Sequence, residues 1–292
     1  YKRQLRASLA TDRWQAWLLL ALLMAVASVT LWRLPAMPNN AVLPSLPMGS
    51  SLSVALTLVI AVTAANLFHQ GYWQRVWAAK DSASLGKGAW LGGGMTVLVI
   101  MVIGGVGIMA AMSGVSLGEP PMPFFALLSD APIWITLPAL VLAVTLVTSS
   151  VDTLQNGIAS LWASGDDNRA LNKARWITVA LMVPVIVIAL QGLSVLRLFL
   201  IADLLCAAIV VPVLLGLWKR MTPLAAISGG LAGFLGAVLP GWLSQGSISA
   251  GVIAATFPNS VPTLGPFVGA LLLSTVVSVM LATVSTKRFA IR

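Results

Sequence analysis

Charged residues are scarce in this chain. They make up 9% of its 292 residues, while hydrophobic residues make up 59%. A soluble domain carries charge on roughly a quarter of its residues. So few charges cannot cover a surface in water, which argues against a soluble protein with an apolar dimer face. The composition predicts an integral membrane protein.

Side chains for metal, redox and catalytic chemistry are also few. The sequence holds one cysteine, Cys206, and one histidine, His69. A disulfide within the chain and a cysteine- or histidine-based metal cluster are therefore excluded, and we expect no cofactor. No phosphate-binding loop, zinc motif or Ser-His-Asp set is present. We therefore expect that the protein is not an enzyme.

Long hydrophobic runs fill most of the chain. A helix needs about 20 residues to cross the hydrocarbon core of a bilayer. About eight stretches reach or approach this length, at residues 14–32, 51–72, 89–112, 132–162, 176–190, 198–218, 223–240 and 262–284. We expect the fifth to extend to Val195 and the fourth to be tilted, with an interfacial segment before Pro138. The sequence predicts an all-α polytopic membrane helical bundle of about eight transmembrane helices.

Basic residues alternate between the loops. The chain has 17 lysines and arginines; only Arg33 and Arg197 fall in outer loops if the N-terminus is cytoplasmic, which leaves 17 − 2 = 15 on the cytoplasmic side. Such asymmetry sets the orientation of membrane proteins. We predict a multi-pass protein of the cell membrane with both termini cytoplasmic. The net charge of +9 then comes from short loops on one side of the lipid bilayer, which is the protein's expected partner, and no nucleic-acid partner is expected.

Polar side chains enter the membrane in the fourth stretch. At 100° per residue, one face of a helix would carry hydroxyl, amide and carboxylate groups from Thr145, Ser149, Asp152, Thr153, Asn156 and Ser160. Oxygen ligands suit a hard cation such as sodium. Hydrogen bonds between packed helices are the alternative. A carboxylate at membrane depth favours an ion site or a polar cavity.

Three further features bear on function or packing. Asn66, His69, Gln70 and Gly71 in the second stretch favour an interrupted helix, which would expose backbone groups near the midplane; a frayed helix end is the alternative. Asp203 either pairs with Arg197 or has a transport role. Two pairs of glycines four residues apart predict close helix packing: Gly88 with Gly92, and Gly229 with Gly233.

Three segments together resemble the sodium/solute symporter family. They are residues 66–81 (NLFHQGYWQRVWAAKD), 149–157 (SSVDTLQNG) and 203–220, from Asp203-Leu204-Leu205 to Trp218-Lys219-Arg220. The resemblance implies a leucine-transporter-type fold, in which two inverted five-helix repeats surround a central site. Residues 1–292 would then form one transmembrane domain, the second half of that core: 14–32 the last helix of the first repeat, 51–218 the second repeat, and 223–284 two peripheral helices.

The resemblance also implies a sodium site. The hydroxyls of Ser149 and Ser150 and the carbonyl of Leu146 occupy the positions of sodium ligands. Residues expected to contact the solute or to couple it to sodium are Asn66, His69, Gln70, Asp152 and Asn156. The remaining ligands would come from N-terminal helices that this chain lacks, so we expect it to be a fragment that cannot transport alone.

The leading hypothesis is sodium-coupled symport of a small polar solute across the cell membrane, with sodium as the coupling ion rather than a cofactor. The segment 66–71 departs from the family's sugar and proline transporters, so the solute is not implied. A symporter-like sensor module of a signalling protein is the alternative, which a long soluble C-terminal extension would indicate.

Overall fold

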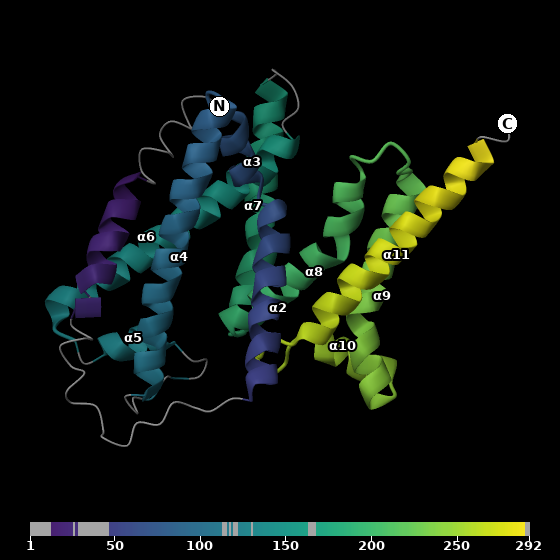
Figure 1. The fold of residues 1–292 in the computed structure, drawn as a ribbon. Coiled ribbons are helices and arrows are strands. Elements are labelled where there is room, and N and C mark those ends of the chain that lie inside the picture. Colours follow the sequence, from purple (N-terminus) through teal and green to yellow (C-terminus); the bar gives the residue numbers. More distant parts are fainter. Residues whose placement is uncertain are drawn as a thin grey trace. The chain divides into compact units, whose positions relative to one another are not determined.

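The computed structural model describes residues 13–25, 27–28, 47–112, 116, 118, 122–129, 131–162 and 168–289, with side chains except at 127, 156, 159–171, 173–175 and 285–289. In these ranges every regular element is an α-helix (Figure 1). The helices are α2 (Met48–Leu67), α3 (Gln70–Trp77), α4 (Ser82–Met112), α5 (Pro123–Leu128), α6 (Ile133–Trp162), α7 (Asn168–Ala189), α8 (Val195–Leu215), α9 (Pro223–Gln245), α10 (Ile248–Ala255) and α11 (Leu264–Phe289).

Six of these helices, α2, α4, α6, α8, α9 and α11, are long and apolar enough to cross a membrane. Shorter apolar helical segments at Arg13–Ala25 and Trp176–Ala189 coincide with the first and fifth predicted spans. The prediction of an all-α polytopic membrane bundle is confirmed. The chain is a multi-pass helical membrane protein.

Several predicted bounds are wrong. Helix α7 extends toward its N-terminus, to Asn168, and ends at Ala189, instead of continuing to Val195. Helix α9 runs through Pro240 to Gln245. The connection after it contains α10, where Gly246 at φ 72° ends one helix and the Ser247 hydroxyl caps the next by accepting from the Ala250 amide. A glycine in the left-handed region followed by a serine cap is a local stop and start signal.

The chain divides into two compact units. Unit 1 comprises Tyr1–Ser45 and Trp73–Thr178, and unit 2 comprises Leu46–Tyr72 and Val179–Arg292. Within unit 1, the buried side chains of Val106 in α4, Leu128 in α5, and Ile135 and Ala139 in α6 form an apolar cluster. The short helix α5 thus packs against the two long ones.

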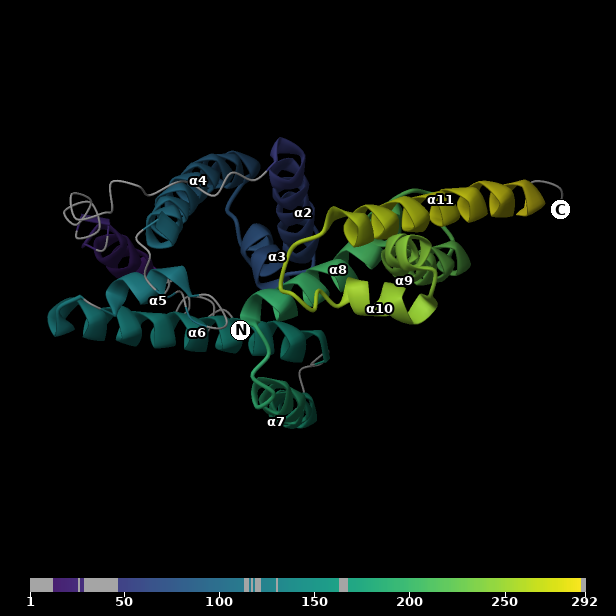
Figure 2. The ribbon, with the colours of Figure 1, turned by 90° about the horizontal axis from the view of Figure 1, so that it is seen from below.

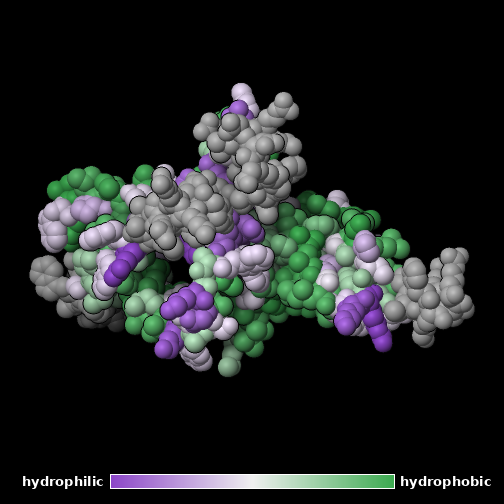
Figure 3. Space-filling view, turned by 90° about the horizontal axis from the view of Figure 1, so that it is seen from above, coloured by the Kyte–Doolittle hydropathy of each residue, from purple (hydrophilic) through white to green (hydrophobic). Residues whose placement is uncertain are grey.

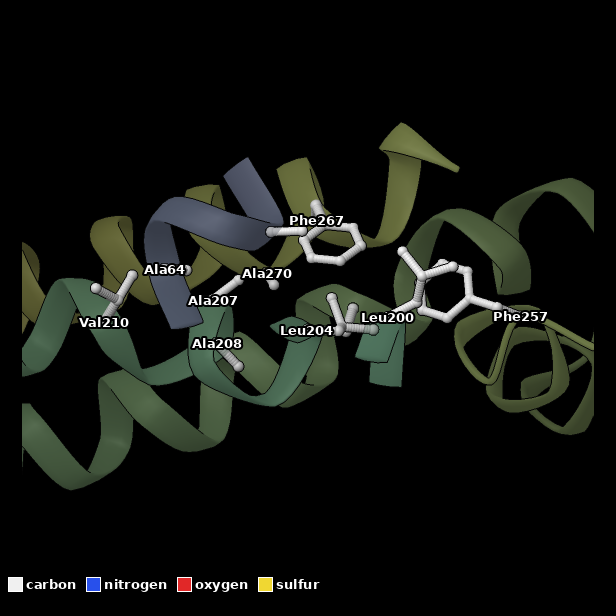
Figure 4. Close-up of a cluster of buried hydrophobic side chains, with 11 residues drawn as sticks. Ala64, Leu200, Leu204, Ala207, Ala208, Val210, Phe257, Phe267 and Ala270 are labelled. Carbon is white, nitrogen blue, oxygen red and sulfur yellow. The ribbon is translucent and has the colours of Figure 1, made fainter. Parts of the chain in front are cut away.

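Unit 2 has a larger core. Its buried residues come from α2, α8, α9, α11 and the loop before α11: Ala61, Ala64, Leu200, Leu204, Ala207, Ala208, Val210, Ala237, Phe257, Phe267 and Ala270 (Figure 4). Most are alanines, because helices that approach closely leave no room for larger side chains. Seen from below, α9 lies beside α10 and α11 (Figure 2), and contacts confirm both neighbours.

Glycines on α9 set the distances to its neighbours. A Cβ on Gly233 would collide with the backbone of Ala208 in α8, and a Cβ on Gly229 would collide with Ser278 Oγ in α11. The predicted packing role of Gly229 and Gly233 is confirmed. Among the described residues, Gly88 and Gly92 show no such packing, because an added Cβ at either would have no atom of this part of the chain within 4 Å.

Large apolar side chains cover much of the outer surface. Hydrophobic residues spread over much of the face in Figure 3, and exposed examples include Trp90 in α4 at 86% and Leu235 in α9 at 68%. An apolar patch of this extent marks a surface that faces something other than water. Lipid chains fit that role on helices of this length.

We expect Gly233→Ala to destabilise unit 2, whereas Gly230→Ala should not. Both changes add one methyl group to α9, and both gain about 1 kcal/mol of helix propensity. The new Cβ at residue 233 meets the Ala208 backbone, which cannot move aside, while at residue 230 it meets only Ile209 Cγ2 at 3.4 Å. Overpacking costs about 1–3 kcal/mol. Thermal unfolding in detergent should give a lower Tm for Gly233→Ala only; equal Tm values would contradict this packing.

Candidate functional site

The apolar helix α2 is interrupted at its C-terminal end. It stops at Leu67, and the amides of Phe68 and His69 donate to the carbonyls three residues back, Ala65 O at 3.0 Å and Asn66 O at 3.2 Å. The helix resumes at Gln70 as α3. The predicted interruption between Ala64 and Gly71 is confirmed, because α2 ends at Leu67 and helical structure resumes at Gln70.

Polar side chains cluster along the chain at this break. The Asn66 amide Nδ2 donates to Val62 O at 2.8 Å, so its Oδ1 is the atom that can accept a hydrogen bond from a solute. The His69 ring stacks on the Tyr72 ring with centroids 4.1 Å apart and 20° between planes, while its Nδ1 is shielded from solvent. Gln70 is half-buried and Gly71 is buried. The break thus offers an amide and an imidazole held in fixed positions.

The polar residues of the fourth predicted span lie on one continuous helix, α6, so they have the helical spacing that places them on one face. Their hydroxyls donate to carbonyls four residues back: Thr145 to Val141 at 2.7 Å, Thr148 to Val144 at 2.8 Å, Ser150 to Leu146 at 2.9 Å and Thr153 to Ser149 at 2.9 Å. These bonds satisfy the hydroxyl hydrogens inside the helix. The oxygen lone pairs remain available to a ligand.

The three predicted sodium ligands occupy neighbouring positions on α6. The Ser150 Oγ and the Leu146 carbonyl oxygen lie 2.9 Å apart, a separation at which two oxygens can contact one cation. Ser149 and Leu146 are half-buried and Ser150 is exposed. A cation at this pair would require the Ser150 hydroxyl hydrogen to turn away from the carbonyl.

The other predicted site residues divide between the units. Asp152, in unit 1 with the three predicted sodium ligands, is exposed. The side chain of Asn156 lies outside the described residues. Asn66, His69 and Gln70 belong to unit 2.

The predicted pairing of Asp203 with Arg197 is wrong. Arg197 instead donates from Nε to the Thr256 carbonyl at 2.9 Å and from Nη2 to the Thr256 hydroxyl at 3.3 Å. Thr256 is 59 residues away in sequence, so helical spacing could not reveal it. Asp203 is 7% exposed.

Asp81, the last residue of the segment 66–81, has a local role. Its Oδ1 accepts a hydrogen bond of 2.6 Å from the Ser84 amide, at the start of α4. This bond, made to the charged form, lowers the pKa of the Asp81 carboxyl. Asp81 therefore caps the first turn of α4.

Comparison with known proteins finds a transporter. Over 194 residues the chain is 30% identical to the spermidine transporter DUR31 of Candida albicans, in an alignment that covers 63% of this chain and 37% of that protein. The chain thus spans well under two thirds of that relative's length. No protein-family model matches the chain, and no solved structure matches it.

We expect the break to be visible in hydrogen exchange. The amides of Gln70 and Gly71 stand in the first turn of α3 and have no carbonyl four residues back to bond within that helix. Those of Ala61 and Ala64 lie inside α2 and are buried. Mass spectrometry of the protein in detergent should show exchange at least about tenfold faster for residues 70–71. Equal protection across 61–71 would mean that α2 and α3 form one unbroken helix.

Proposed function

We propose that this protein is a secondary transporter that moves a small polar solute across the membrane together with sodium. The interruption of an apolar helix between Leu67 and Gln70 carries the proposal. Broken helices of this kind present carbonyls and half-helix ends to ions and substrates.

The sodium site would lie on α6. The Leu146 carbonyl and the hydroxyls of Ser149 and Ser150 are uncharged oxygen ligands, which hold a hard cation without burying a fixed negative charge. Three ligands leave a sodium ion incompletely coordinated. We propose that further oxygens come from helices outside this chain, in keeping with its coverage of only 37% of the related transporter.

The solute would be polar and able to interact with an acidic group. The related protein is named as a spermidine transporter, and spermidine is a cationic amine. The exposed carboxylate of Asp152, on the same helix as the sodium ligands, would attract an ammonium group. Polyamines are therefore the first solutes to test, with neutral polar solutes such as amides as the comparison.

We expect Ser149→Ala to weaken sodium dependence in the full-length protein. Losing one oxygen ligand worth about 1.4 kcal/mol raises the sodium concentration for half-maximal uptake about tenfold. Thr148→Val is the matched control, because it removes a hydroxyl from the same helix that is outside the ligand set. Uptake of labelled solute into proteoliposomes at varied sodium measures both. An unchanged sodium dependence in Ser149→Ala and Ser149→Ala/Ser150→Ala would leave the pair a packing feature only.

The same proposal places both termini in the cytoplasm. Lys219, before α9, then lies inside, and Asn259, between α10 and α11, lies outside. Both side chains are exposed. A cysteine in place of Asn259 should react with a membrane-impermeant maleimide added to intact cells. A cysteine in place of Lys219 should react only after permeabilisation. The reverse pattern would invert the orientation.

A further inference from the structure

A buried carboxyl group in α8 has no role in the proposed sodium site. Asp203 is the ninth residue of α8 (Val195–Leu215), which places it about 12 Å from the start of the helix at 1.5 Å per residue. This helix is the most apolar of the six candidate spans, with a mean hydropathy of 2.8. Asp203 is only 7% exposed. The group therefore lies well inside an apolar span, and little of its surface is accessible from outside the protein.

No group of opposite charge faces Asp203 from the part of unit 2 that the structure describes. Arg197, on its own helix, is bound to Thr256, and the other titratable residue of α8 is Cys206. Helices α2, α9 and α11 pack against α8. The sequences of α2 and α9 contain no charged residue or histidine, with His69 following two residues after α2. In α11 the charged residues are Lys287 and Arg288, in its last turn.

Asp203 also makes no hydrogen bond to any residue in the described ranges. Its neighbours along α8 are apolar: Leu200 and Leu204 precede and follow it in the core, and Ala207 lies one turn on, beside Ala64 of α2 (Figure 4). An ionised carboxylate buried in such surroundings without a partner costs many kcal/mol. Within the described part of unit 2, only a bound cation would neutralise this charge.

The surroundings select the kind of cation. A metal ion replaces its water shell with several oxygen ligands. Of the side chains that flank Asp203 on α8, Leu200, Leu204 and Ala207 are hydrocarbon and Cys206 is a thiol, so none of them offers an oxygen ligand. A proton needs only the carboxylate itself and leaves a neutral group that an apolar interface tolerates.

We propose that Asp203 is a proton-binding site that controls the packing of α8. With the proton bound, the neutral carboxyl stays buried while α8 packs on α2 and α11. When the proton leaves to water, the carboxylate must be hydrated, so the interface around it opens. A role in transport rests on the proposed function: in the transport cycle, α8 would move when Asp203 loses its proton.

Cys206 provides the reporter. It lies three residues after Asp203, close to one helical turn, and is half-buried and free. In a background where Cys206 is the only cysteine, the rate of its reaction with a small neutral maleimide is measured from pH 5.5 to 8.5. The Asp203→Asn variant is the matched control, because it is nearly isosteric with the protonated carboxyl and cannot titrate. Dividing the two rates at each pH cancels the part of the thiol's ionisation that the two variants share, and leaves the direct effect of the Asp203 charge on the thiol.

We expect this ratio to rise at least about tenfold from acidic to alkaline pH. A negative charge beside a thiol disfavours the reactive thiolate, so faster labelling with Asp203 present reports opening rather than a direct effect of charge. Asp203→Glu, which keeps a titratable group, should retain the rise. A ratio that stays flat or falls overturns the proposal.

A second measurement covers the case in which Asp203→Asn fails to fold. Infrared difference spectra of the unaltered protein between acidic and alkaline pH should contain the absorption of a neutral carboxylic acid, shielded from rapid deuterium exchange. Its absence at acidic pH contradicts the site. Neither readout needs transport: a rising ratio without sodium-dependent uptake leaves this inference standing and removes the proposed function, whereas sodium-dependent uptake with a flat ratio does the opposite.

Discussion

The hydrogen bonding of the backbone is the constraint on which the rest of this structure depends. Hydrocarbon offers no partner for an amide or a carbonyl, so each apolar segment satisfies these groups internally as a helix. Hydroxyl side chains follow the same rule: Thr57 is fully buried and donates to Ser53 O at 2.7 Å, and the hydroxyls of α6 donate to carbonyls one turn back. Polar residues can therefore enter the spans, because their hydrogens are satisfied within the helix that carries them.

A proline interrupts the backbone hydrogen bonds of α9, and the neighbouring helix α11 packs closely against α9 at that point. Pro240 lies inside α9 and has no amide hydrogen, so the carbonyl of Gly236 loses its usual partner. Gly269 of α11 lies directly on that carbonyl, where a Cβ would collide with it, and the proline ring meets Gly265 and Gly269. The close approach allows a weak Cα–H contact to the carbonyl. Here glycine is needed for space, since a side chain would separate the two helices.

The sequence predicts features that depend on composition or on spacing within one helix. Hydropathy located the spans because burial in lipid needs only an apolar composition, and the break near His69 follows from polar residues and glycine at the end of an apolar run. The sequence does not predict contacts between residues that lie far apart in the chain. Arg197 binds Thr256 after the chain has passed through α9 and α10, and Phe257 adopts φ 49° with its ring 5.8 Å from that of Phe267. No local pattern encodes either contact.

The candidate site shows the same division between local and distant information. Ser149 and Ser150 follow Leu146 by three and four residues, so helix geometry alone brings their oxygens close to the Leu146 carbonyl. The distance of 2.9 Å between Ser150 Oγ and the Leu146 carbonyl oxygen follows from this spacing. In the proposed sodium site, one helix face presents only part of the oxygens that the ion needs, and the rest would come from elements far away in sequence. The affinity of the proposed site for sodium would therefore depend on how helices that are distant in the sequence are assembled.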